Sequence, residues 1–199
     1  MSNPSQRIIF LTEEITKEEM KKVLALVESA NKIVDGYFGI RSSFDLVICR
    51  GSWEMEIQGI SRRPESSQGK YDDTRSTSIT DYHLQEIVIR YDSAKFGHYL
   101  HELIHGVVCK GHTRQLREGL AWYFTLRLTE EYRYVRPSYP SWIDDLYIRP
   151  IRKLAHVVGD DFLKDFATGR ASIEEDALSS DIQELFLPEE FFYAKGRYQ

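Results

Sequence analysis

Five consecutive residues bring together the side chains that a catalytic metal site requires: His101, Glu102, Leu103, Ile104 and His105. On a helix, residues four apart lie on one face, so the two imidazoles could bind a single ion. The carboxylate between them could then act on a water molecule bound to that ion. This HExxH spacing indicates metal-assisted hydrolysis, with His101 and His105 as zinc ligands and Glu102 as the general base.

The residues around the motif predict that it lies on a helix. Asp92 or Ser93 could cap the start of this helix, and Gly111 could end it after Lys110. Apolar residues recur between these limits three or four positions apart, as in a buried helical stripe: Phe96, Leu100, Leu103, Ile104, Val107 and Val108. Each histidine of the motif follows a stripe residue by one position, so we expect both at the edge of the buried face.

A catalytic zinc ion usually has three protein ligands and keeps a fourth position for water, so a third donor is needed. A second helix is predicted after Thr113, its cap, because apolar residues repeat every four positions: Leu116, Leu120, Phe124 and Leu128. If the two helices pair as an antiparallel hairpin, Glu118 returns to the level of His105 and becomes the third ligand. Gly119 beside it costs about 1 kcal/mol of helix propensity, a cost that close packing at the site would explain.

Other potential donors are weaker candidates. Cys109 lies eight residues beyond His101, about 12 Å along a helix, which is too far for both to bind one ion. His98 is expected to pack or to support a ligand, and His112 to be solvated in the turn. The cysteines, Cys49 and Cys109, do not form a disulfide framework and are expected to be free and buried.

The HELIH run, followed by EGLA at 118–121, resembles the gluzincin metallopeptidases of the peptidase-MA-like superfamily. The resemblance implies His101, His105 and Glu118 as zinc ligands and Glu102 as the base. Thermolysin-type relatives carry an aspartate where this chain has Trp122, and the GxMEN run of aminopeptidase N relatives is absent from the sequence. Neither of these two subfamilies is therefore indicated.

Related sites add a tyrosine or histidine that shares the negative charge developing on the substrate oxygen. Tyr147 is the first candidate for this catalytic role, because similar chains often carry a tyrosine on the third helix of this region. His156, nine residues further along, is the second. The alternative interpretation is that Tyr147 is a core aromatic residue and His156 a surface imidazole.

The resemblance and the hydrophobic patterns together predict an α+β protein with a zincin-like fold. A small mixed sheet would pack on the helix that carries HExxH, and a mainly helical C-terminal part would follow. Residues 1–199 would form one domain, with an α/β part at 1–112 and a helical part at 113–199 that supplies the third ligand.

Several further elements are predicted from periodicity and turn residues. Helices are expected at 12–36, at 141–158 with a kink at Pro150, at 160–168 and at 173–186; strands are expected at 44–49, 53–57 and 83–91; residues 61–81 are expected to form a loop. The strand at 83–91 could be a sheet edge that pairs with an extended substrate. Alternatively, it is central and the strand at 53–57 forms the edge.

Composition excludes some classes of partner. The chain has 199 residues, of which 42% are hydrophobic and 29% charged, as in ordinary globular domains. A net charge of -5 gives no footprint for nucleic acid, so we expect none as a partner. The N-terminal segment has only four consecutive apolar residues, at 8–11, so we expect no export signal, no membrane association and a cytoplasmic location.

These observations predict a zinc metallopeptidase that acts on a peptide or protein substrate. Two alternatives remain. One is a catalytically inactive relative that binds zinc or a protein partner on the same fold, against which the intact Glu102 argues because a structural site needs no base. The other is a metal-free α+β interaction domain in which His101 and His105 are ordinary residues at a helix edge.

Overall fold

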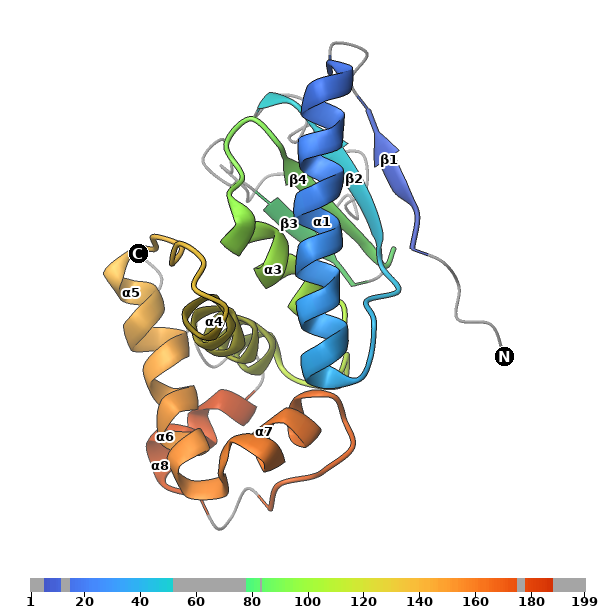
Figure 1. Cartoon of the computed structure of the whole chain (residues 1–199). Coiled ribbons are helices and arrows are strands. Elements are labelled where there is room, and N and C mark those ends of the chain that lie inside the picture. Colours follow the sequence, from blue (N-terminus) through green and yellow to red (C-terminus); the bar gives the residue numbers. More distant parts are fainter. Residues whose placement is uncertain (1–5, 12–14, 52–77, 83, 175–177, 188–199) are drawn as a thin grey trace, which may run out of the picture. The chain divides into compact units, whose positions relative to one another are not determined.

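The computed structural model describes residues 6–11, 15–51, 78–82, 84–174 and 178–187 (Figure 1). The chain divides into two compact units, residues 1–106 and 107–199. The described part of the first unit combines a sheet with helices, and that of the second is helical. This mixture agrees with the α+β class expected from the sequence, with the boundary at 106/107 rather than at 112/113.

Four strands of the first unit form one mixed sheet in the order β1-β2-β4-β3 (Figure 1). Strands β1 (Ile8–Phe10), β2 (Asp45–Cys49) and β4 (Glu86–Arg90) are parallel, and β3 (Ser78–Asp81) is antiparallel to β4. The chain from β1 to β2 passes through a helix, as a parallel connection requires. Within the described residues, β3 therefore lies at one edge of the sheet.

Strands β2 and β4 correspond to the two strands predicted at 44–49 and 83–91, residue 83 itself lying outside the described residues. Strand β1 is not predicted because three residues are too few for a periodic pattern. Strand β3 corrects the expectation of a loop over 61–81, whose last residues belong to the sheet. The strand predicted at 53–57 lies outside the described residues, and β4 is central rather than an edge.

The first helix, α1 (Lys17–Phe38), begins and ends later than expected. Thr16 is its N-cap and forms a capping box with Glu19: the Thr16 hydroxyl accepts from the Glu19 amide at 3.2 Å, and the Glu19 carboxylate accepts from the Thr16 amide at 2.8 Å. The helix ends at Gly39, whose φ of 67° is in the left-handed region. The sequence signal for this start is the Thr-x-x-Glu spacing at 16–19.

Helix α3 (Phe96–His105) carries the HExxH motif and is shorter than predicted at both ends. Its N-cap is Lys95, whose backbone amide donates to Nδ1 of His98 at 2.9 Å. At the other end, the amide of Cys109 donates to the carbonyl of Ala167 at 2.7 Å, and not to the carbonyl of His105 as a continuing helix would require. The helix therefore ends at the motif itself.

The second unit begins with helix α4 (Arg114–Glu131), which confirms the predicted second helix and its cap. The Thr113 hydroxyl accepts from the Leu116 amide at 3.3 Å. The predicted apolar stripe is buried in full. Of its members, Leu120, Phe124 and Leu128 are 0% exposed. One face of the helix packs on the segment around residues 144–158.

The helix predicted at 141–158 consists of three parts: α5 (Ser141–Ile143), a π-helical turn η2 (Asp144–Ile148) and α6 (Arg149–Val158). The predicted disturbance at Pro150 is present, but as a wide turn before the proline, because Pro150 has no amide to donate and its ring would collide with the preceding turn.

The remaining helices are short. Helix α7 (Asp160–Ala167) confirms the prediction at 160–168, with Gly169 after it. Of the helix predicted at 173–186, the structure has only α8 (Ser180–Gln183) and a 3₁₀ turn η4 (Glu184–Phe186) in the described residues. The Thr113 side chain donates to the carbonyl of Leu185 at 2.5 Å, so the start of α4 is tied to this turn.

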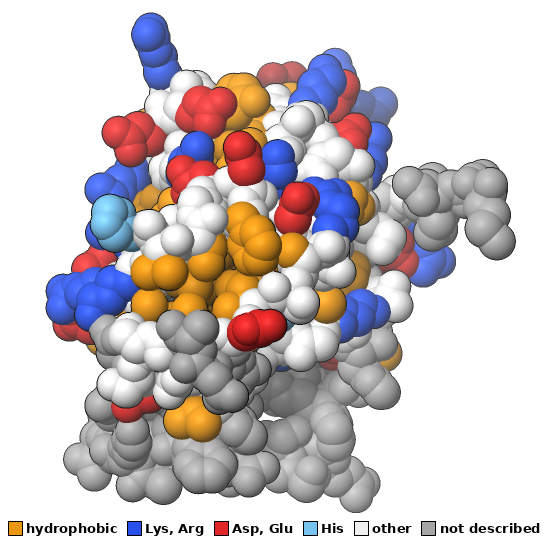
Figure 2. Space-filling view, turned by 90° about the horizontal axis from the view of Figure 1, so that it is seen from below, with side chains coloured by type: hydrophobic (Ala, Val, Ile, Leu, Met, Phe, Trp, Pro, Cys, Tyr) orange, Lys and Arg blue, Asp and Glu red, His pale blue; other side chains and the backbone are white. Residues whose placement is uncertain are grey.

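Figure 2 shows a face on which hydrophobic side chains gather at the centre and charged side chains lie around them. In the described part of the chain, the most exposed large hydrophobic residues are Val135, Val157 and Trp142, at 78%, 63% and 50%. None of the described helices combines the length and the apolar character that crossing a bilayer would demand.

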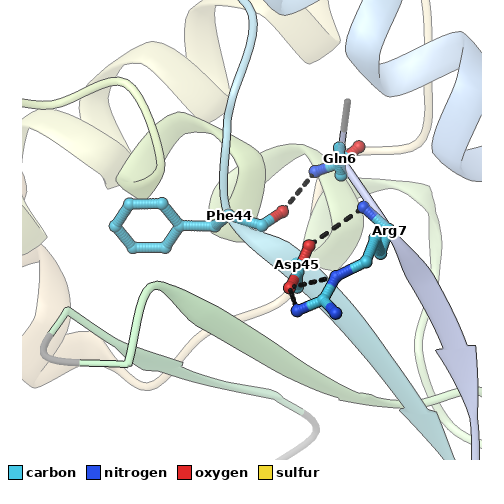
Figure 3. A network of polar contacts seen from close by, with 4 residues as sticks. All are labelled: Gln6, Arg7, Phe44 and Asp45. Carbon is cyan, nitrogen blue, oxygen red and sulfur yellow. Dashed lines mark hydrogen bonds and ion pairs between the residues drawn. The ribbon is translucent and has the colours of Figure 1, made fainter. Parts of the chain in front are cut away.

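Besides the backbone pairing of β1 with β2, the Asp45 carboxylate binds Arg7, the residue before β1 (Figure 3). Asp45 accepts from the Arg7 amide at 3.0 Å and from Nε of the Arg7 guanidinium at 2.9 Å. The Gln6 side chain adds a hydrogen bond to the carbonyl of Phe44 at 2.8 Å. Hydrogen bonding from Arg7 lowers the pKa of the Asp45 carboxyl below its ordinary value.

We predict that Asp45→Asn lowers the melting temperature at neutral pH and that this difference disappears in acid. Because the pKa of Asp45 is lowered on folding, its contribution is complete above the ordinary pKa of about 3.9 and is lost as the pH falls through the lower folded-state pKa. Thermal melts from about pH 7 to pH 2 measure this difference. Glu28→Gln, in an exposed pair with Lys32, is the matched control and should change little. A difference that persists at the lowest pH would contradict the assignment.

Candidate metal centre

Helix α3 buries all three polar residues of the HExxH motif within the first unit. His101, Glu102 and His105 are 7%, 5% and 2% exposed. The helix packs against α1 and against strand β3, so the three polar side chains are enclosed more completely than the predicted position at a helix edge implied. Polar groups buried this deeply need partners, because an unpaired buried group costs free energy.

The Nε2 atoms of the two histidine rings face each other. Nε2 of His101 and Nε2 of His105 are 3.1 Å apart, and the rings are nearly perpendicular, at 88°, with centroids 4.6 Å apart. Two nitrogens on one tetrahedral zinc ion would be about 3.3 Å apart, given zinc–nitrogen bonds near 2.0 Å. The pair is therefore close to the spacing of two ligands of one ion. Without an ion, one ring must donate a proton to the other.

Strand β3 supplies partners for the buried carboxylate. The Ser78 hydroxyl donates to Oε1 of Glu102 at 2.6 Å, and the Thr80 hydroxyl donates to Oε2. An ionised carboxylate can accept about four hydrogen bonds, so the two hydroxyls leave acceptor capacity for a water molecule. Glu102 is thus held in place by the neighbouring strand.

The next residue of this series contacts the second histidine. The Tyr82 hydroxyl lies 2.6 Å from Nδ1 of His105, and the two rings meet edge to face with centroids 5.9 Å apart. If Nε2 of His105 binds a metal, Nδ1 carries the proton and donates a hydrogen bond to the tyrosine oxygen. We call Ser78, Thr80 and Tyr82 the hydroxyl row.

Sequence reasoning missed the hydroxyl row because residues 61–81 were expected to form a loop. The signal that could have found it is the alternation in Ser-Ile-Thr-Asp-Tyr at 78–82, since residues two apart on a strand share a face. Such a run of alternating hydroxyls immediately before a predicted strand is too short to be distinctive without the pairing to β4.

The predicted third ligand, Glu118, is half-buried on α4. The candidate donor atoms of His101, His105 and Glu118 all lie within 4.8 Å of one another, so these three residues form a group that could hold a metal ion. The group is the one that the sequence predicted.

Gly119 explains how α4 packs next to Glu118. A Cβ atom at Gly119 would lie 2.7 Å from Cγ1 of Ile151 and 3.0 Å from the carbonyl oxygen of Tyr147. The first contact is shorter than real Cβ atoms make and the second is tighter than most, so a larger residue at this position would force Ile151 or the backbone at Tyr147 to shift. The helix propensity lost at Gly119 thus has a packing reason, as the sequence suggested.

The two candidate oxyanion donors have different surroundings in the second unit. Tyr147 is 6% exposed and packs in an apolar cluster with Leu126, Ile143 and Ile148. Its carbonyl oxygen lies against Gly119, beside Glu118. His156 is exposed on α6, about 13 Å of helix rise beyond Tyr147.

His98 and His112 make hydrogen bonds within the fold, and the two cysteines differ in burial. Burial lowers the pKa of His98, whose ring caps α3, and of His112. His112 is not solvated as expected: its Nε2 donates to the carbonyl of Phe166 at 2.9 Å. Neither cysteine forms a disulfide; Cys49 is buried as predicted and its thiol donates to the carbonyl of Ile89 at 3.5 Å, whereas Cys109 is half-buried.

Comparisons of the chain with models of protein families, with curated proteins and with solved structures find no match.

We predict opposite effects of the same substitution at two helical glycines. Gly119→Ala should destabilise the protein by about 1 to 3 kcal/mol, because overpacking against Ile151 and Tyr147 outweighs the gain in helix propensity. Gly36→Ala, the matched control in α1, meets nothing within 4 Å and should stabilise it by about 0.5 kcal/mol. Urea unfolding measures both free energies. Stabilisation by both substitutions would show that α4 does not need the close approach.

Proposed function

We propose that this protein is a zinc-dependent metallopeptidase of the gluzincin type, with a zincin-like fold. The observation that carries the proposal is the convergence of the His101 and His105 Nε2 atoms, 3.1 Å apart and buried, beside a buried Glu102. A pair of helix-edge histidines without a function would not need to face each other through the nitrogens that bind metals.

The donor set fits zinc. Two imidazole nitrogens and one carboxylate oxygen are the ligands of many catalytic zinc sites, which keep a further position for water. Glu118 would supply the carboxylate, and its donor atom belongs to the group whose members lie within 4.8 Å of one another. A bound zinc ion would lower the pKa of its water toward neutrality and polarise the carbonyl that it touches.

Glu102 has the position and the acceptor capacity for the proton transfers of peptide hydrolysis. It would accept a proton from the water whose oxygen forms the new bond to the carbonyl carbon. As the bond from carbon to nitrogen breaks, Glu102 would return that proton to the leaving amine. Tyr147 would donate a hydrogen bond to the oxygen that gains negative charge. The support for Tyr147 over His156 is that its backbone carbonyl lies against Gly119, the residue after Glu118, whereas His156 is exposed further along α6.

The substrate class that we propose is an extended peptide. Strand β3 carries Ser78 and Thr80 of the hydroxyl row and pairs on one side with β4; among the described residues it has no second partner strand. The unpaired side of an edge strand can add a peptide through backbone hydrogen bonds. This arrangement would place a peptide beside the strand that positions Glu102.

The first test separates metal binding from catalysis. The dialysed protein should contain one zinc ion per chain, and His105→Ala should lose it. Glu102→Gln should retain zinc while its cleavage of a peptide library falls by at least about 100-fold. Glu28→Gln, an exposed acid on α1, is the control and should change neither property.

Each contrary outcome of this test identifies an alternative. A wild-type protein without zinc would support the metal-free interaction domain. Zinc that is lost on His105→Ala, with no cleavage of any library peptide by the wild type, would support an inactive zinc-binding or protein-binding module. Cleavage that Glu102→Gln leaves unchanged would remove Glu102 as the base.

The second test concerns the oxyanion donor. Tyr147→Phe should lower kcat by about 100-fold without changing the zinc content, because it removes a hydroxyl and keeps the packed ring. Tyr123→Phe, which removes a hydroxyl bonded to Asp160, is the matched control. If His156→Ala lowers kcat and Tyr147→Phe does not, the second candidate has the role.

A further inference from the structure

We infer that the hydroxyl row, Ser78, Thr80 and Tyr82, positions both the metal ligand His105 and the base Glu102. This inference rests on the proposed function, since it gives a positioning role to residues that surround the proposed metal centre. None of the three belongs to the HExxH motif, and none is expected to touch the ion.

The row has its regular form because of strand geometry. Residues two apart on a strand lie on the same face, so Ser78 and Thr80 face α3 together. Tyr82 follows two positions later, immediately after β3 ends at Asp81. The antiparallel pairing of Thr80 with Ile87 of β4 fixes the height of the row relative to the sheet.

Each hydroxyl meets a different functional atom. Ser78 and Thr80 donate to the two oxygens of Glu102, the first at 2.6 Å. With both oxygens engaged, rotation of the carboxylate about its terminal bond would break two hydrogen bonds at once. The carboxylate plane is therefore fixed, which is what a base needs in order to meet a water molecule in one orientation.

Tyr82 acts on the ligand by selecting its tautomer. Its hydroxyl oxygen, 2.6 Å from Nδ1 of His105, can accept a hydrogen bond from a protonated Nδ1. This tautomer leaves the Nε2 lone pair for a metal. The edge-to-face contact of the rings holds the imidazole plane as well. The loss of such a supporting hydrogen bond typically weakens metal affinity by about 10-fold to 100-fold.

The two parts of the row have separable consequences. Tyr82→Phe should weaken zinc binding by about 10-fold or more, measured by competition with a chromophoric chelator. It keeps the ring, so the zinc-free protein should still fold, with a melting temperature lowered by the loss of one buried hydrogen bond. Tyr123→Phe is the matched control, because it removes a tyrosine hydroxyl bonded to Asp160 and should leave the zinc affinity unchanged.

Thr80→Val should leave the zinc affinity unchanged. It should lower kcat for a cleaved library peptide by about 10-fold, with KM little altered, because Glu102 is no longer held in one orientation toward the attacking water. Thr80→Ser, which restores the hydroxyl, should recover most of the loss. Thr168→Val, which removes a hydroxyl bonded to a helix carbonyl in α7, is the control for the substitution itself.

The outcomes distinguish failure of this inference from failure of the proposed function. A wild-type protein that binds no zinc would overturn the proposed function. Wild-type zinc binding with an unchanged zinc affinity in Tyr82→Phe would overturn the role of Tyr82 alone. A KM effect in Thr80→Val without a kcat effect, or no recovery in Thr80→Ser, would show that Thr80 contributes only structure. In zinc-loaded wild-type protein, the ¹⁵N signals of His105 should show a protonated Nδ1; a protonated Nε2 would also overturn the assignment.

Discussion

Burial of two imidazoles and a carboxylate on one helical turn is the constraint from which much of the first unit follows. Groups of this kind lose their hydration when they are enclosed, and that loss must be offset by hydrogen bonds or by an ion. Here the carboxylate is satisfied by hydroxyls from β3, and one imidazole by Tyr82. The Nε2 atoms of the two rings face each other. Strand β3 therefore lies where its alternate residues contact α3. Its register on β4 places Ser78 and Thr80 beside Glu102.

The second unit meets a different requirement around Glu118. Its helix α4 carries a fully buried apolar stripe on one face and a glycine on the side that approaches residues 147 and 151. A wide π-helical turn precedes Pro150 in the same region. Helical distortions of this type are frequent at functional sites, where they change the direction of a side chain without ending the helix.

The candidate ligands could be selected from the sequence because their spacing reflects local geometry. The four-residue interval of HExxH and the stripe of α4 depend on the helical period alone, and Thr113 is a strong local cap. The C-terminal end of α3 was predicted poorly, since it depends on a hydrogen bond between Cys109 and Ala167, which are far apart in sequence. Strand β3 and the hydroxyl row were missed for a related reason. Four residues with two hydroxyls have no strong periodic signal, and only their pairing with β4 makes them a strand.

Among the described residues β3 lies at the edge of the sheet, and this position has a consequence for motion. Edge strands commonly open at a lower free energy than the centre of a sheet, in small cooperative units that amide hydrogen exchange can detect. Any opening of β3 would also withdraw its hydroxyls from Glu102, so fraying of the strand and loss of a positioned carboxylate would be a single event. An ion held by His105 would then slow exchange along β3, even though it touches no residue of that strand. Local stability at the edge of the sheet and order at the centre of α3 would be two measures of one equilibrium.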